Sequence, residues 1–246
     1  MRWTERAWAV LAAGVLAGMQ AAAQQPPPAP AAPQTRFVVV LDAAHGGGDS
    51  GARLADGQLE KNVTLALSVR LRSLLGARGF WVVTTRESDA AVDPDKRAGI
   101  ANHARAQACL VLHATQSGSG VHLFASSLPP ALRTGDSNLP MGAAAASPVR
   151  IPAWKTAQAG WVTRSLALMG VLNSSLLQAG MNVTLARIEL PGLESMTCPA
   201  VAVEVAPELG ADKKIAAGPD DEDYQARVAA ALAAALVEDR AEAHPL

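Results

Sequence analysis

The chain has 246 residues, half of them apolar, and a formal net charge of -1. This composition supports one sizeable hydrophobic core rather than two or three. No run of lysine and arginine is interleaved with aromatic residues, so the charge pattern of a nucleic-acid-binding protein is missing. We therefore expect one catalytic-size domain and no nucleic-acid partner.

The first 35 residues have the pattern of an export signal followed by a spacer. Two arginines precede an apolar run from Ala7 to Gly18, and Ala21 to Ala23 follow as a small-residue cleavage site, which is typical of a signal peptide over residues 1–23. The alternative is a permanent membrane anchor, but the run is shorter than the roughly 20 residues that a spanning helix needs. Residues 24–35, rich in proline and alanine, indicate a solvated linker. We expect export to the periplasm or cell envelope, with no stable membrane insertion after cleavage.

Residues 36–240 alternate between strand-like and helix-like patterns, which favours a catalytic domain of the α/β class. Apolar β-branched runs predict strands, and apolar residues at helical spacing predict helices. The predicted strands are 37–42, 80–85, 109–113, 120–125, 183–188 and 200–205, and the predicted helices are 60–78, 95–106, 154–178 and 223–237. Residues 126–152 break the alternation and are interpreted as a surface insertion. We expect a three-layer fold, with an open, mostly parallel or mixed sheet of about six strands and helices on both faces.

Four ionisable residues lie at the ends of these predicted elements. His45 follows the first strand, His113 ends the third, Glu60 begins the first helix, and Glu204 lies near the end of the last strand. Residues at the carboxyl ends of parallel strands gather at one edge of the sheet, so these side chains are expected to meet there. Two histidines and a carboxylate with one open position form a catalytic zinc site. We therefore predict His45, Glu60 and His113 as ligands of Zn²⁺.

A second carboxylate is needed to move protons beside such an ion. Glu204 is the candidate, because a carboxylate can take a proton from water and deliver it to a departing amine. Its neighbours in the sequence are strongly apolar, and a buried glutamate needs a partner or a function. Asp42 is predicted to orient His45 from behind, and Asp49 is a further possible ligand.

Ordinary structural explanations compete with these assignments. A lone histidine after a strand is more often a satisfied polar group than a ligand, and Glu60 would suit a helix N-terminus through the helix dipole. Cys109 and Cys198 could form a disulfide in an oxidising compartment, but two buried free thiols are favoured. A serine hydrolase is disfavoured, because the chain contains no Gly-x-Ser-x-Gly elbow.

Over roughly Phe37 to Leu236 the chain resembles the zinc-dependent N-acetylmuramoyl-L-alanine amidases of the bacterial cell wall, amidase family 3. Seven segments carry this resemblance. They are Val38 to Gly47 (similar to Asp-Pro-Gly-His-Gly-Gly after a strand), Leu59 to Leu65 (Glu-Lys-Asp-x-x-Leu), Thr85 to Asp89 (Thr-Arg-x-x-Asp), Arg97 to Asn102 (Arg-x-x-x-Ala-Asn), Leu112 to Ala114 (Ser-x-His-Ala-Asn), Gly120 and Val121 (Gly-Val-Glu), and Pro199 to Glu204 (Pro-x-x-Leu-Val-Glu).

The resemblance implies an enzyme that hydrolyses the amide bond between N-acetylmuramic acid and the L-alanine of the stem peptide in peptidoglycan. It implies that His45, Glu60 and His113 bind zinc and that Glu204 is the catalytic acid and base. Asp42, Arg97 and His122 are assigned to substrate binding or to support of the ligands. His122 could instead simply alternate on its strand, and this interpretation is favoured. A monomer is expected, with an activator protein as a possible partner.

The chain also departs from the family pattern. Ala43-Ala44 replaces Pro-Gly, Thr115 replaces Asn, His122 replaces the Glu of Gly-Val-Glu, and residues 206–208 replace the start of Gly-Phe-x-x-Asn. These changes concern substrate contacts at the rim more than the metal site. Two rival functions remain: a zinc peptidase of carboxypeptidase type, in which Arg53 or Arg86 would hold a terminal carboxylate, and a non-catalytic peptidoglycan-binding relative. In the second, the 126–152 insertion would block the cleft.

Overall fold

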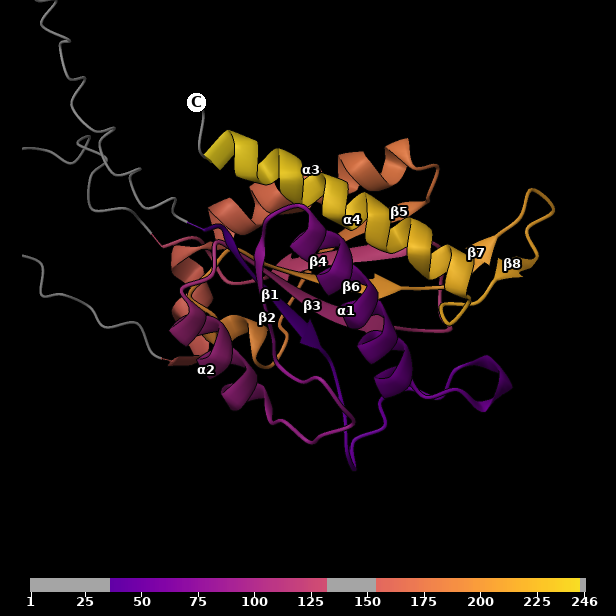
Figure 1. The fold of residues 1–246 in the computed structure, drawn as a ribbon, viewed down its shortest axis with the longest axis horizontal. Helices are drawn as coiled ribbons and strands as arrows, with labels where there is room; N and C mark the ends of the chain where they lie inside the picture. The colour runs from indigo at the N-terminus through magenta and orange to yellow at the C-terminus, as the bar shows by residue number, and fades with distance from the viewer. Residues whose placement is uncertain (1–35, 132–153, 244–246) are drawn as a thin grey trace, which may run out of the picture. The chain divides into compact units, whose positions relative to one another are not determined.

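A mixed six-stranded sheet forms the centre of the computed structural model, which describes residues 36–131 and 154–243 (Figure 1). Its strands are β1 (Val38–Ala43), β2 (Trp81–Thr84), β3 (Ala108–Ala114), β4 (Val121–Ser126), β5 (Val183–Ile188) and β6 (Ala200–Val205), in the spatial order β2-β1-β3-β6-β4-β5. The predicted three-layer α/β architecture with a mixed sheet is confirmed.

Strand direction divides the sheet into two blocks. Strands β2, β1, β3 and β6 are parallel, whereas β4 is antiparallel to β6 and parallel to β5. The register of β3 and β6 pairs His113 with Glu204, and the register of β6 and β4 pairs Glu204 with His122. Three polar residues far apart in the sequence therefore lie in one row across neighbouring strands.

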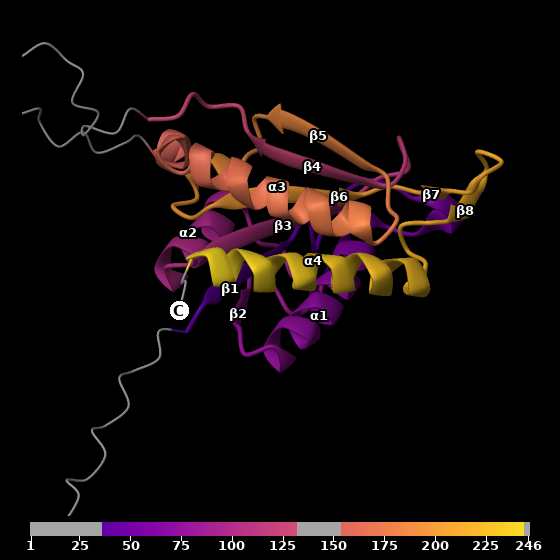
Figure 2. The same cartoon turned by 90° about the horizontal axis from the view of Figure 1, so that it is seen from above.

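Helices cover both faces of the sheet (Figure 2). On one face, α1 (Glu60–Ala77), α3 (Val162–Gln178) and α4 (Glu222–Ala243) bury the larger apolar cluster, with α4 packed against both α1 and α3. The other face carries α2 (Pro94–Ala104), the 3₁₀ segment Leu193–Ser195 and a smaller cluster. In the part of the chain that the structure describes, no helix combines the length and hydrophobicity that crossing a bilayer requires.

Helix α2 illustrates how the local sequence sets an element. The side chain of Asp93 accepts a hydrogen bond from the backbone N–H of Lys96, and Pro94 occupies the first turn, where its missing N–H costs nothing. The helix ends at Arg105, whose φ of 50° lies in the left-handed region. The N-terminal cap at Asp93 thus places Arg97 on the first turn of the helix, next to the end of β1.

The structure corrects several expectations. The helix predicted over residues 154–178 is divided into a 3₁₀ segment, Trp154–Gly160, and α3, with the break after Gly160. A small hairpin of β7 (Glu208–Leu209) and β8 (Ile215–Ala217) was not predicted, because its strands are too short to show periodicity.

The preference for free thiols is also wrong, since Cys109 and Cys198 form a disulfide. Both cysteines belong to the smaller cluster, at the ends of β3 and β6 that lie away from His113 and Glu204. The bridge joins residues 89 positions apart in the sequence. The signal peptide, the linker and residues 132–152 of the insertion lie outside the described residues.

Candidate metal centre and catalytic site

His45, Glu60 and His113 converge at the carboxyl ends of β1 and β3. One potential ligand atom from each lies within 4.8 Å of the other two. The buried carboxylate of Glu60 lies between the two rings, 3.1 Å from Nε2 of His45 and 2.8 Å from Nδ1 of His113. The three residues predicted as ligands from the sequence are therefore brought together by β1, α1 and β3.

Asp49, and not Asp42, orients the ring of His45. Its Oδ2 lies 2.8 Å from Nδ1 of His45, which leaves Nε2 on the side of Glu60. Asp42 is bonded elsewhere: it points to the α2 face of the sheet and accepts hydrogen bonds from Thr85 and Arg97. A carboxylate on the far nitrogen of a ligand histidine fixes its tautomer and ring position, so Asp49 has the role that was predicted for Asp42.

The charges in this cluster favour an ionised carboxylate between two imidazoles. Burial favours the neutral form of Glu60, but hydrogen bonds from His113, His45 and the backbone N–H of Ala52 outweigh it and hold the pKa of Glu60 well below its ordinary value. The hydrogen bond to Glu60 is the largest effect on His45 and, with Asp49, it raises the pKa of His45 despite partial burial. Without metal, the site therefore attracts a proton to His45.

Gly51 allows the two ligands to approach each other. A Cβ atom at this position would lie 2.6 Å from Oε2 of Glu60 and 2.6 Å from Cδ2 of His45, and the backbone has a φ of +63°. Both conditions select glycine.

Arg97 anchors the loop that carries His45. It is buried and makes an ion pair with Asp42 at 2.6 Å, and it donates to the backbone carbonyls of Ala43, His45 and Val92. This places Arg97 among the supporting groups. With its donors used inside the protein, it is not available to bind substrate.

A second anchor comes from Arg86, which is buried beside α1. Its guanidinium donates to the carbonyls of Ala43, Ala44 and Lys61 and to the hydroxyl of Thr64. Arg86 therefore cannot hold the terminal carboxylate of a peptide, as a carboxypeptidase would require. The other candidate for that role, Arg53, is exposed.

Lys61 and Asp89 together form a polar clamp on the turn that contains Gly46, Gly47 and Gly48. Lys61 Nζ lies 2.8 Å from the carbonyl of Gly47 and 2.7 Å from Asp89, whose other oxygen accepts from the N–H of Gly47. The Glu-Lys and Thr-Arg-x-x-Asp segments of the sequence thus contribute supporting contacts around the ligand loop, which composition and periodicity alone did not reveal.

Glu204 lies beside the ligand cluster and contacts His122. Its Oε2 is 2.8 Å from Nδ1 of His122, and its side chain is 28% exposed. The expectation of a buried glutamate is therefore wrong, because the strand end opens to solvent at this edge. His122 alternates on its strand, as the favoured interpretation expected, and in addition its ring contacts Glu204.

The donor set fits a zinc ion. Two imidazoles and one carboxylate, with no thiolate, are ligands that Zn²⁺ accepts with one position left open. The outer nitrogen of His45 is already held by Asp49, as is usual for a metal-binding histidine. Among the described residues, no other group of three such side chains lies close enough to form a metal site.

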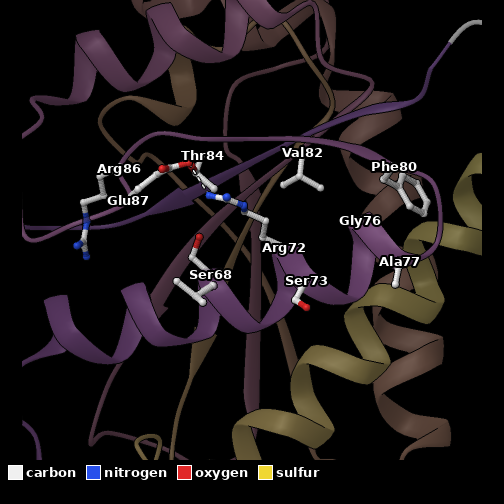
Figure 3. Close-up of a pocket in the computed structure, with 11 residues that line it drawn as sticks. Ser68, Arg72, Ser73, Gly76, Ala77, Phe80, Val82, Thr84, Arg86 and Glu87 are labelled. Atoms are coloured by element: carbon white, nitrogen blue, oxygen red, sulfur yellow. Dashed lines mark hydrogen bonds and ion pairs between the residues drawn. The ribbon is translucent and has the colours of Figure 1, made fainter.

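A groove of about 640 Å³ lies between α1 and the edge strand β2, apart from this cluster (Figure 3). Arg72 and Glu87 form an ion pair across it, and Arg86 lies at one end. None of the residues predicted for catalysis or metal binding lines this groove. This groove is therefore separate from the candidate metal site at the carboxyl ends of β1 and β3.

Known proteins resemble this chain in both sequence and fold. The family model described as N-acetylmuramoyl-L-alanine amidase matches residues 39–238. The germination-specific N-acetylmuramoyl-L-alanine amidase of Bacillus subtilis is 32% identical over 110 residues, which is 37% of this chain and 46% of that protein. The chain thus spans less than half of this curated relative.

Two solved structures share the fold. The catalytic domain of CwlV, an N-acetylmuramoyl-L-alanine amidase from Bacillus (Paenibacillus) polymyxa, superimposes with a TM-score of 0.59 at 24% identity, covering 82% of this chain and 97% of that one. The CwlD amidase from Clostridioides difficile, solved in complex with the GerS lipoprotein, gives a TM-score of 0.59 at 20% identity, covering 84% of this chain and 100% of that one. At these identities the likeness concerns the fold.

Proposed function

Because the chain belongs to the N-acetylmuramoyl-L-alanine amidase family, we propose that it hydrolyses the amide bond between the lactyl group of N-acetylmuramic acid and the L-alanine of the stem peptide in peptidoglycan. The observation that carries this proposal is the meeting of His45, Glu60 and His113 within 4.8 Å at the sheet edge, with Glu204 paired to His113 in the register of the next strand. The proposed metal site and the proposed proton carrier are thus adjacent.

In the proposed mechanism His45, Glu60 and His113 hold Zn²⁺ and Glu204 moves the proton. When bound, the ion activates water at neutral pH and polarises the carbonyl that is attacked. Glu204 accepts a proton from the attacking water on Oε1, since Oε2 is bound to His122, and then delivers it to the nitrogen of the leaving L-alanine. The C–N bond breaks, leaving a lactyl carboxylate and a free amine.

The test is metal content and product release from one preparation. We expect the purified chain to bind about one zinc ion and to release stem peptide with a free L-alanine amino group from purified peptidoglycan. Glu204→Gln should keep the metal and lose cleavage. Glu242→Gln, an exposed glutamate near the end of α4, is the matched control and should retain both properties.

The outcomes separate the parts of the proposal. Loss of zinc in His45→Ala and His113→Ala supports the ligand set, whereas zinc retained in both variants contradicts it. Metal binding without cleavage of peptidoglycan by the unmodified chain would favour the non-catalytic relative. The carboxypeptidase alternative predicts release of C-terminal amino acids, and the enclosed position of Arg86 argues against it.

Location and partners complete the proposal. The substrate lies outside the cytoplasmic membrane, so we place the enzyme in the cell envelope, exported through residues 1–23. N-terminal sequencing of the chain from a cell fractionation experiment checks both points, and an uncleaved N-terminus would contradict them.

An activator is included because the similar CwlD amidase was solved with a lipoprotein. Weak cleavage that rises on addition of an envelope extract would support it.

A further inference from the structure

We propose that His122 is a positioning residue for the reaction, holding Glu204 in the orientation in which it moves the proton. This inference rests on the proposed function, because it concerns the carboxylate that function uses. It starts from one contact: Nδ1 of His122 lies 2.8 Å from Oε2 of Glu204. A carboxylate oxygen at this distance accepts, so Nδ1 carries the proton and donates it.

The backbone makes this contact part of the fold. His122 and Glu204 are directly opposite in the antiparallel pairing of β4 and β6, and both side chains rise from the same face of the sheet. The terminal torsion of a glutamate is otherwise broad and poorly defined. A donor fixed by the strand register therefore selects one orientation of the carboxylate, with Oε2 bound and Oε1 free.

The ring of His122 is itself held in place. A Cβ atom at Gly118 would lie 2.6 Å from Cε1 and 2.8 Å from Nε2 of this ring, so the glycine backbone closes over it. Phe124, two positions further along β4, also meets the ring edge-on, at 6.3 Å between centroids. With 14% of its side chain exposed, the imidazole is better shielded than the carboxylate that it holds.

The row of strands links this pair to the metal ligands. His113, Glu204 and His122 occupy neighbouring positions on β3, β6 and β4. Glu204 therefore has a ligand of the predicted ion on one side and its own hydrogen-bond donor on the other. The position of His122, on the side of Glu204 away from His113, suits a residue that aligns the proton carrier without taking part in metal binding.

The sharpest test compares His122→Asn with His122→Asp, because these side chains have nearly the same size and only the amide donates. Asn places an N–H close to the position of Nδ1, whereas Asp offers only acceptors to Glu204. We expect His122→Asn to retain kcat within a few-fold, and His122→Asp to lose about 10- to 100-fold, which is part of the roughly 100- to 10,000-fold that a positioned proton carrier contributes. KM and zinc content should change little in either variant. Thr184→Val, an exposed residue opposite His122 on β5, is the control.

A readout without substrate tests the contact itself. In protein with ¹⁵N-labelled histidine, the Nδ1 of His122 should appear protonated, and Glu204→Gln should shift its resonance more than it shifts those of the other histidines. The signal is assigned from its absence in His122→Asn. A resonance that does not respond to Glu204→Gln would contradict the contact.

Two results would overturn the inference. Equal kcat in His122→Asn and His122→Asp would show that the donor is irrelevant, and loss of zinc or of folding in both variants alike would show a purely structural role. Failure of the proposed function is distinguishable, since the unmodified chain would then not cleave peptidoglycan at all.

Discussion

The two ends of the candidate site are held in different ways. At the β1 end, the loop carrying His45 is fixed by two buried arginines and by the Lys61–Asp89 clamp. At the β6 end, Glu204 is partly exposed and has His122 as its side-chain partner. The ligand loop is thus integrated with the core, whereas the proton carrier lies at an open strand end.

This difference separates stability from chemistry. Substitutions of the buried arginines at the β1 end should reduce folding stability and metal binding together, because the same contacts support both. Substitutions at the β6 end should change the rate and leave the fold intact. An enzyme that binds a metal through preorganised ligands and transfers a proton from water to a leaving amine would require both kinds of support.

The largest effect is expected from Arg97→Ala. The substitution leaves the buried carboxylate of Asp42 without its ion pair, and breaking such a pair typically costs about 3–5 kcal/mol. Arg72→Ala is the matched control, because its partner Glu87 and Arg72 itself are both exposed, where an ion pair contributes about 0–1 kcal/mol. Urea unfolding of the metal-free proteins measures both. Equal losses in the two variants would show that Asp42 does not depend on Arg97.

Removal of the disulfide should come next. Cys109→Ser with Cys198→Ser is expected to lower the free energy of unfolding by about 2–4 kcal/mol, because a bridge across 89 positions restricts the unfolded chain. The bridge joins the ends of β3 and β6 away from His113 and Glu204, so kcat should stay within a few-fold. Guanidinium unfolding and peptidoglycan cleavage measure the two quantities. A large fall in kcat at a temperature where the variant remains folded would contradict this separation.

The contrast between the two ends also explains what could be predicted from the sequence. The strands and the convergence of the candidate ligands were predictable, since apolar runs such as that of β1 end in ionisable residues, and parallel strands bring their ends together. The contact of His122 with Glu204 could not be predicted, because it depends on β4 running antiparallel to β6. The residue pattern of a six-residue strand does not indicate the direction in which the strand runs. The same limit applies to the disulfide, which depends on register.

The role of Asp49 was missed for a different reason. It stands four positions after His45 in a turn, where no periodicity indicates which way a side chain points. Asp42 was the more obvious choice because it ends the strand, but its side chain faces α2. Sequence patterns thus indicated the candidate ligands and left their orienting groups undetermined.

Asp49→Asn should weaken metal binding without unfolding the protein. Loss of the carboxylate that holds Nδ1 of His45 is expected to lower zinc affinity about 10- to 100-fold. At a pH above the folded pKa of His45, the stability of the metal-free protein should change little, because Asp49 is largely exposed. Competition with a coloured chelator measures the affinity, with Asp212→Asn as the exposed control. An unchanged affinity would assign the orientation of His45 to its backbone alone.

The pH dependence of metal binding should give the smallest and most specific effect. A ligand histidine must be neutral, and the contacts with Glu60 and Asp49 raise the pKa of His45 above 6.5 in the metal-free protein. Zinc affinity should therefore begin to fall already above pH 6.5 as the pH is lowered, approaching about a tenfold loss per pH unit for one displaced proton.

The stability of the metal-free protein should change in the opposite direction over the same range. A raised pKa in the folded state means that the contribution of His45 is fully present below pH 6.5 and is lost as the pH rises through its folded value. Acidification through this window should thus strengthen the metal-free fold while it weakens zinc binding. Asp49→Asn should move both transitions to lower pH, because it removes one of the contacts that raise the pKa of His45. Transitions that do not move would show that His45 is not the group that exchanges its proton for the metal.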